Sequence, residues 1–180
     1  MTITAPEMTE SDHADNPTIT VRSVDQQDNS IILPQAFAIA VPDTAEADNV
    51  ISIAAPQATM IARHASGRPW LMVRMPQAYV TASTAPGTRI VAVGTCSASV
   101  EDLNRIARRG ASLSETAAEV MRFDGSFTVY ALRDATILAC GPAMQTHRVF
   151  HARILGTTIV SDRADTLAAL GRLPLDTAAV

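Results

Sequence analysis

Two histidines, His147 and His151, have the HxxxH spacing and are the residues best placed in this sequence to bind a metal ion. On a helix, both imidazoles would share one face and could hold a single ion. The surrounding residues, HRVFHARI, favour a strand instead. Four residues of strand separate two side chains by about 13 Å, which is too far for one ion. The spacing therefore predicts no metal site.

The two cysteines are the candidate nucleophiles. Cys96 follows a predicted strand and precedes a predicted helix in the sequence GTCS, and a thiol at a helix N-terminus can have a lowered pKa. No neighbouring base is evident, so a small buried residue is the favoured interpretation. Cys140 ends an apolar strand and is predicted to be a core residue. Two cysteines without CxxC spacing predict neither a zinc site nor a disulfide framework, and they indicate a reduced, intracellular protein.

Composition narrows the class of protein. The chain has 180 residues, of which 47% are hydrophobic and 18% charged, and its net charge is -4. This length is enough for one domain with a hydrophobic core. The negative net charge gives no sign of a basic surface that would bind nucleic acid. All 14 basic residues are arginine, which excludes a phosphate-loop lysine and a Schiff-base lysine. The polar N-terminus is no secretory signal, and no apolar run reaches the ~18 residues of a membrane span. We expect a cytoplasmic protein with neither nucleic acid nor membrane as a partner.

The N-terminal third has little periodicity. Residues 1–30 are polar and predicted to be disordered. Residues 31–60 contain two short apolar runs interrupted by prolines, which predict edge strands or an ordered arm. We therefore expect residues 1–59 to form a disordered or extended arm and residues 60–180 to form the folded domain.

From residue 60 the patterns are sharper. Strands are predicted over 70–75, 78–82 and 89–94. A helix is expected from Ser97 or Ser99 to a cap at Gly110, and a second begins at Ser112, where Glu115 completes a capping box. Two hairpins follow, over 127–140 and 147–160, and a last helix runs from 161 or 162 to 170. Asp162 is its expected cap and Gly171 its end. This order predicts an α+β fold, a layered sandwich of antiparallel sheets covered by helices.

Four segments resemble those of a known family: FDGSF at 123–127, HRVFHA at 147–152, IVSD at 159–162 and LPLD at 173–176. In this order they are similar to the glutaminase domain that begins asparagine synthetase. With HASGRPW at 64–70 they are closest to a subgroup, the asparagine synthetase-related macrolactam cyclases of actinobacterial lasso peptide pathways. The resemblance covers about residues 60–176.

The resemblance implies an α/β/β/α fold of the Ntn-hydrolase, class II glutaminase type. Such cyclases use ATP and Mg to adenylate an acidic side chain of a precursor peptide, and the peptide's N-terminal amine then closes an isopeptide ring. That chemistry belongs to a synthetase domain with an SGGxDS loop, which this sequence lacks. The implied partners are a synthetase domain or chain, the precursor peptide and leader-peptide-processing proteins. No cofactor is expected in this chain itself.

The departures from the family concern catalysis. A working glutaminase of this class begins its mature chain with cysteine, whose free amine serves as the base. Here Thr2 follows Met1, both cysteines are internal, and CGPAM replaces the family's DR-x-G turn. We therefore carry over no catalytic residue. If a pocket persists at the former glutaminase site, Arg74, Asp124 and Arg148 are predicted to contact a substrate or partner there.

Two other functions remain open from the sequence. The chain could be a stand-alone protein- or peptide-binding module that uses residues 1–60. A small enzyme that uses Cys96 or the histidine pair ranks last.

Overall fold

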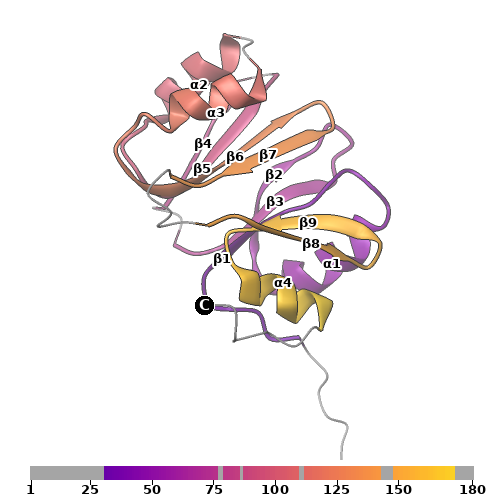
Figure 1. Ribbon diagram of the computed structural model, residues 1–180. Helices are drawn as coiled ribbons and strands as arrows, with labels where there is room; N and C mark the ends of the chain where they lie inside the picture. Colours follow the sequence, from indigo (N-terminus) through magenta and orange to yellow (C-terminus); the bar gives the residue numbers. More distant parts are fainter. Residues whose placement is uncertain (1–30, 77–78, 86, 110–111, 143–147, 173–180) are drawn as a thin grey trace, which may run out of the picture. The chain divides into compact units, whose positions relative to one another are not determined.

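The structure is a computed structural model, and it describes residues 31–76, 79–85, 87–109, 112–142 and 148–172. These residues form a mixed α+β fold with two antiparallel sheets and four α-helices (Figure 1). The α+β class predicted from the sequence is confirmed. The predicted C-terminal LPLD segment, the Gly110 cap and His147 lie outside the described residues.

The first sheet combines strands from both ends of the described region. Its strands are β1 (Phe37–Ala40), β2 (Thr59–Arg63), β3 (Pro69–Arg74), β8 (Phe150–Ile154) and β9 (Thr157–Ser161). Their order is β2-β3-β1-β9-β8, so β2 and β8 are the edges. Each neighbouring pair is antiparallel.

The central strand of this sheet, β1, differs from the prediction of edge strands or an arm over residues 31–60. All four of its residues are buried, and it pairs with β3 on one side and β9 on the other. Helix α1 (Ala47–Ala54) and the 3-10 turn η1 (Ala55–Gln57) follow it. The sequence FAIA is apolar at every position because both faces of a central strand are covered. The packed region thus includes residues from Ile31 onward.

The second sheet comes from one continuous stretch of chain. Its strands are β4 (Val80–Ala82), β5 (Arg89–Cys96), β6 (Gly125–Arg133) and β7 (Thr136–Cys140), in that order across the sheet. Strand β6 is buried on both faces, as its sequence predicted: Phe127 and Val129 pack against one cluster, and Tyr130 and Leu132 against another.

Two glycines of the β5–β6 ladder, where β6 begins, have no room for a side chain. Gly125 lies opposite Cys96 with φ +137°, and a Cβ atom there would lie 2.0 Å from the Thr95 carbonyl oxygen. Gly94 has the same problem, since its Cβ would lie 2.3 Å from the Ser126 carbonyl oxygen. Only a residue without a side chain fits at either position.

Helices α2 (Val100–Arg108) and α3 (Leu113–Val120) begin where the sequence predicted. Ser99 caps α2 in a reciprocal capping box with Asp102, and Ser112 caps α3 in the same way with Glu115. Each box satisfies backbone N–H groups that the first helical turn leaves free. The buried face of α2 is Leu103, Ile106 and Ala107.

Both predicted hairpin turns are confirmed. Arg133 pairs with Thr136 around Asp134, and Ile154 pairs with Thr157 around Leu155 and Gly156. Asp134 and Leu155 have positive φ angles of 53° and 50°.

The prediction that Asp162 caps the last helix is wrong. Helix α4 (Ala164–Gly171) has Arg163 at its N-cap position, without a side-chain cap. The Asp162 carboxylate instead accepts the backbone N–H of Ala38 at 2.8 Å. Strand β9 ends at Ser161, so this carboxylate satisfies the β1 donor at the point where the ladder stops. The helix ends with Arg172 in the left-handed conformation, one residue beyond the predicted Gly171.

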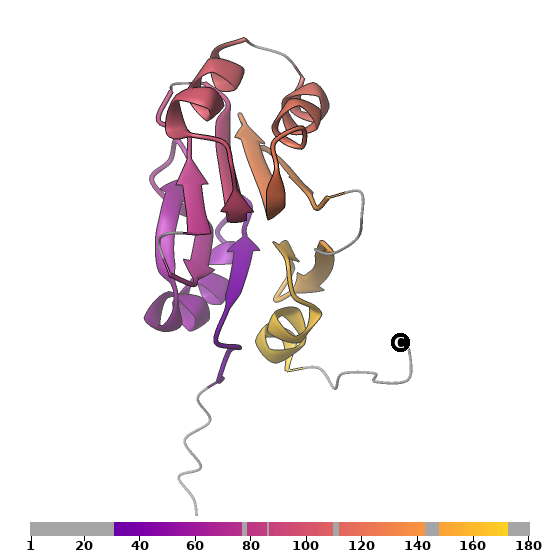
Figure 2. The ribbon, with the colours of Figure 1, turned by 90° about the vertical axis from the view of Figure 1, so that its left-hand side faces the viewer.

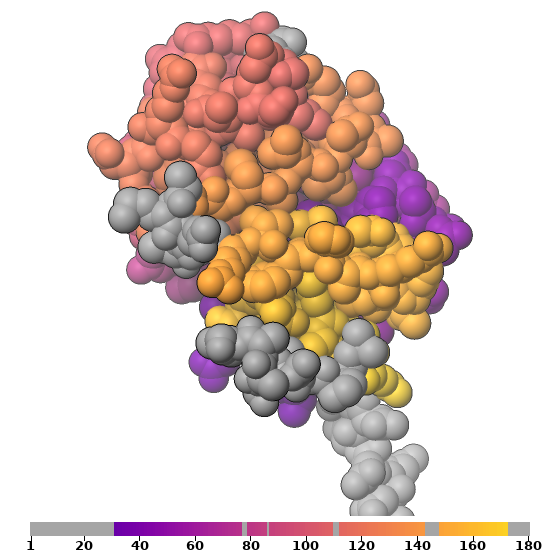
Figure 3. All heavy atoms as spheres, in the orientation of Figure 1, coloured from indigo at the N-terminus to yellow at the C-terminus, as the bar shows by residue number. Residues whose placement is uncertain are grey.

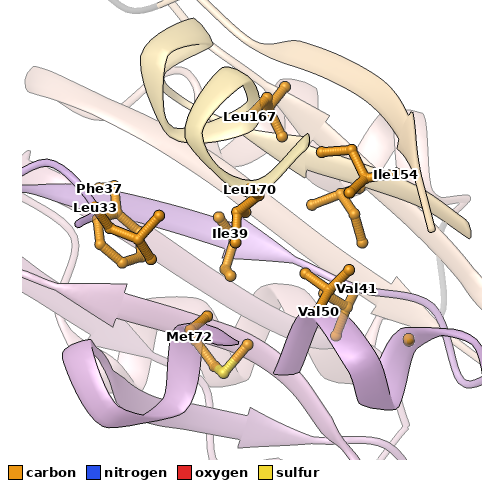
Figure 4. Close-up of a cluster of buried hydrophobic side chains, with 12 residues drawn as sticks. Leu33, Phe37, Ile39, Val41, Val50, Met72, Ile154, Leu167 and Leu170 are labelled. Atoms are coloured by element: carbon orange, nitrogen blue, oxygen red, sulfur yellow. The ribbon is translucent and has the colours of Figure 1, made fainter. Parts of the chain in front are cut away.

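Three buried clusters hold these elements together. The first joins the first sheet to α1 and α4 and includes Ile39, Val50 and Leu170 (Figure 4). The second joins β5 and β6 to α2 and α3. The third draws residues from both sheets, among them Trp70, Val91 and Tyr130, and so lies between them. Figure 2 shows α2 and α3 beside one sheet and α1 and α4 beside the other.

Candidate binding cleft between two edge strands

The structure does not gather the three predicted contact residues into one pocket. Arg74 ends β3, donates to the Leu33 carbonyl oxygen at 3.3 Å and lines a pocket of about 460 Å³. Asp124 is exposed just before β6, where its backbone exchanges hydrogen bonds with Ser97. Arg148 is exposed ahead of β8. Among the pockets described, none contains Asp124 or Arg148, and their role as a set stays a prediction.

Both cysteines are half-buried free thiols that pack against the second cluster. Burial raises the pKa of the Cys96 thiol, which outweighs a hydrogen bond from the Ala98 backbone, and burial also raises the pKa of Cys140. A thiol with a raised pKa is a poor nucleophile at neutral pH. Cys96 lies opposite Gly125 and Cys140 opposite Val129, positions about 13 Å apart along β6, so the two cannot form a disulfide.

His151 is exposed on β8, since residues 150–154 form a strand, whereas His147 lies outside the described residues, so the separation expected for the pair stays a prediction. Within the described ranges, no group of three or more His, Cys, Asp and Glu residues could hold a metal ion. Likewise, no helix in that part of the chain is long and apolar enough to cross a membrane.

The largest pocket described is a cleft of about 910 Å³ where the edge strand of one sheet faces the edge strand of the other. One wall is the β2 segment from Met60 to Ala65, and the other is the end of β4 with the turn to β5, from Ala82 to Ala85. Trp70, Val91 and Leu132, all from the cluster between the sheets, also line it. Its volume falls within the range of small-ligand sites. We call it the β2–β4 cleft.

Charged groups line the same cleft. Arg63 and Arg89 supply two guanidinium groups, and Asp134 supplies a carboxylate at the hairpin turn. Arg63 is exposed and donates to the Gly67 carbonyl oxygen at 2.6 Å. Arg89 is half-buried and has no hydrogen-bond or ion-pair partner among the described residues. It lies opposite Leu132 in the β5–β6 ladder and alternates with Ile90, so it shares the strand face of Val91.

Two ring nitrogens in the cleft's lining residues are buried without a partner in the described structure: His64 Nδ1 and Trp70 Nε1. His64 Nε2 lies 2.9 Å from the Val41 carbonyl oxygen. A carbonyl only accepts, so Nε2 carries the proton, and Nδ1 of the neutral ring is an acceptor. The indole Nε1–H is a donor. Native proteins give nearly all such buried groups a hydrogen-bond partner. These two nitrogens are therefore a donor and an acceptor that remain free beside the cleft in the described part of the chain.

A smaller pocket of about 500 Å³ is lined by residues of the β6–β7 and β8–β9 hairpins. Figure 3 shows these two segments side by side. Arg153, Glu46 and Thr158 contribute polar groups to it. The larger volume of the β2–β4 cleft makes it the stronger binding candidate.

The buried tyrosine between the sheets does not offer acid–base chemistry. Burial raises the pKa of Tyr130 well above its ordinary value, and the nearby negative charge of Asp162 raises it further. A phenol in this setting stays protonated throughout the neutral range.

The sequence did not point to the β2–β4 cleft. Its lining comes from segments that are distant in sequence and meet only when the two sheets pack. One signal was present: Arg89 shares a strand face with the apolar residues Val91 and Val93, so it places a charge on an inward face.

Comparisons with family models, with curated proteins and with solved structures found no match to this chain. The class that fold and site define is therefore an α+β domain with two antiparallel sheets and a mixed polar and apolar cleft between their edges.

Proposed function

We propose that this chain is a non-catalytic, glutaminase-like domain of an ATP-dependent, asparagine synthetase-related macrolactam cyclase of the lasso peptide type. In this proposal the domain packs against a synthetase domain or chain and helps to shape the cavity for the precursor peptide. ATP and Mg act in the synthetase part. The layering would be that of the Ntn-hydrolase fold.

The observation that carries the proposal is where the resembling segments fall in the fold. FDGSF forms the turn into β6, residues 148–152 of HRVFHA lead into β8 and form its first three positions, and IVSD spans the junction from β9 toward α4. The glycine of FDGSF has a physical reason, because no side chain fits at Gly125. In this proposal the segments act as structural joints of the two-sheet fold.

The chemistry of the described residues supports a non-catalytic role. Both thiols have pKa values raised by burial, and neither has a base positioned against it in the described structure. A macrolactam cyclase has no need of ammonia from glutamine, since its nucleophile is a peptide amine. A domain that has lost the glutaminase machinery fits that chemistry.

A titration by calorimetry of this chain against its separately expressed synthetase partner tests the proposal. We expect saturable association, and we expect the chain alone to hydrolyse neither glutamine nor ATP. Glutamine hydrolysis by the purified chain would refute the non-catalytic role.

The β2–β4 cleft favours a second candidate, a stand-alone protein- or peptide-binding module. An edge strand can add an extended peptide by backbone hydrogen bonds, and β2 presents such an edge beside the cleft. A folded chain that shows no affinity for the synthetase partner would favour this candidate over the first.

A further inference from the structure

We propose that the β2–β4 cleft is a binding site for an organic carboxylate, with Arg89 as the cation that holds the carboxylate group. The inference rests on the geometry of this cleft, and it holds whether or not the chain associates with a synthetase partner.

Arg89 differs from the other arginines in the described part of the chain. Arginines 63, 68, 74, 105, 109, 133 and 163 each donate to a carboxylate, a hydroxyl or a carbonyl oxygen. The arginines without such a partner, at 108, 122, 148, 153 and 172, are exposed and can be solvated fully. Arg89 alone among the described arginines is half-buried and unpaired.

A half-buried guanidinium without a partner has lost part of its hydration and has gained no protein contact in return. Its planar fork matches the two oxygens of a carboxylate, and such charge-assisted pairs are among the stronger hydrogen bonds. A ligand carboxylate would therefore give Arg89 the hydrogen bonds that the described residues do not provide. The contact would be strengthened by the reduced access of water on the strand face that Arg89 shares with Val91.

The remaining lining defines the rest of the ligand. Trp70, Val91 and Leu132 offer apolar contact, so the carboxylate should carry a hydrocarbon portion. Asp134 lies on the same cleft and repels additional negative charge. Arg63 offsets that repulsion only in part, because it is exposed and its charge is screened by water. This balance favours a singly charged carboxylate over a phosphate group.

A second polar atom on the ligand could form a hydrogen bond with one of two buried ring nitrogens. Trp70 Nε1–H is an unused donor and His64 Nδ1 an unused acceptor. Both atoms are closed to solvent, so contact with either requires a small shift of the lining side chains.

The experiment uses NMR titration of the whole chain with hexanoate. Trp70 is the only tryptophan in the sequence, so its indole N–H signal reports on the cleft without assignment ambiguity. We expect saturable movement of that signal by hexanoate and at least tenfold weaker binding of hexanamide, which keeps the size and removes the charge. This comparison needs no variant.

Two substitutions locate the site. Arg89→Gln should weaken hexanoate binding at least tenfold, whereas Arg108→Gln, which removes an exposed and unpaired arginine, should change it less than twofold. Equal binding of hexanoate and hexanamide, tighter binding of inorganic phosphate, or an equal effect of the two substitutions would overturn the proposal.

The carboxylate could belong to a free acid or to an acidic side chain in a peptide. A second titration with a capped five-residue peptide, one glutamate flanked by valines, separates these sources. Tighter Arg89-dependent binding of the peptide than of hexanoate assigns the site to peptides, and the reverse assigns it to small acids. If neither ligand moves the Trp70 signal, the cleft is not a carboxylate site.

Discussion

Replacing Gly125 with alanine should destabilise the domain far more than the same change at Gly156. Both glycines have positive φ, +137° and +86°, so an alanine at either costs about 1–2 kcal/mol of backbone strain. The two sites differ in the room available for a new side chain. The nearest atom to a new Cβ at Gly156 is the Glu46 Cγ at 3.7 Å, an ordinary contact, whereas at Gly125 it is the Thr95 carbonyl oxygen at 2.0 Å.

The clash at Gly125 cannot be relieved by a side-chain rotation, because the opposing atoms are backbone. Strands β5 and β6 would have to separate by more than an ångström at this end of their ladder. Overpacking of this kind adds about 1–3 kcal/mol, so the Gly125→Ala loss should be about 2–5 kcal/mol in total. The Gly156→Ala loss should stay near 1–2 kcal/mol.

Urea unfolding followed by Trp70 fluorescence measures both losses. With an m value of about 2 kcal/mol/M, the Gly125→Ala midpoint should fall about 0.5–1.5 M below that of Gly156→Ala. Equal midpoints would mean that the close approach of β5 and β6 relaxes at little cost. The steric reason given for the glycine of the FDGSF segment would then be wrong.

Three further outcomes are expected. Asp162→Ala should lower the free energy of unfolding by about 1–3 kcal/mol, because it leaves the buried Ala38 N–H without an acceptor. The control Asp165→Ala, which removes an ion pair at the surface, should lower it by less than about 1 kcal/mol. Equal losses in urea unfolding would contradict the role of Asp162 at the end of the ladder. Cys96 should react with iodoacetamide at pH 7 more slowly than free glutathione does, since burial raises its pKa, and a faster reaction would revive a catalytic thiol. Hydrogen bonds from Ser112 hold the pKa of Glu115 below its ordinary value, so the capping contribution is present at neutral pH and is lost as pH falls through that lowered pKa. Unfolding measured between pH 6 and 3 should therefore show a weaker pH dependence for Ser112→Ala than for the wild-type chain.

The features that the sequence predicted well are local ones. The capping boxes that begin α2 and α3 involve residues three positions apart, and the hairpin turns at Asp134 and Gly156 join strands that are adjacent in the chain. The two-sided burial of β6 also follows from its own apolar sequence. In each case the determining interactions lie within a few residues.

The features that the sequence did not predict depend on distant partners. Strand β1 is four residues long, and its place at the centre of a sheet depends on pairing with β3 and with β9 near the other end of the described chain. Asp162 lies where a helix cap is expected, yet its acceptor role is set by Ala38. The β2–β4 cleft requires both sheets to be in place, so no window of sequence contains it.

The arrangement of strands has a consequence for the order of folding during synthesis. Strands β4 to β7 follow one another in the chain and can pair once residue 140 has left the ribosome. The other sheet cannot close until residues 157–161 have been made, because only β9 covers the second edge of β1. Until then a fully apolar strand edge is open to pairing with another chain. A nascent or truncated chain that ends before β9 should therefore be the form most prone to aggregate, and the last strands act as the closing step of the domain.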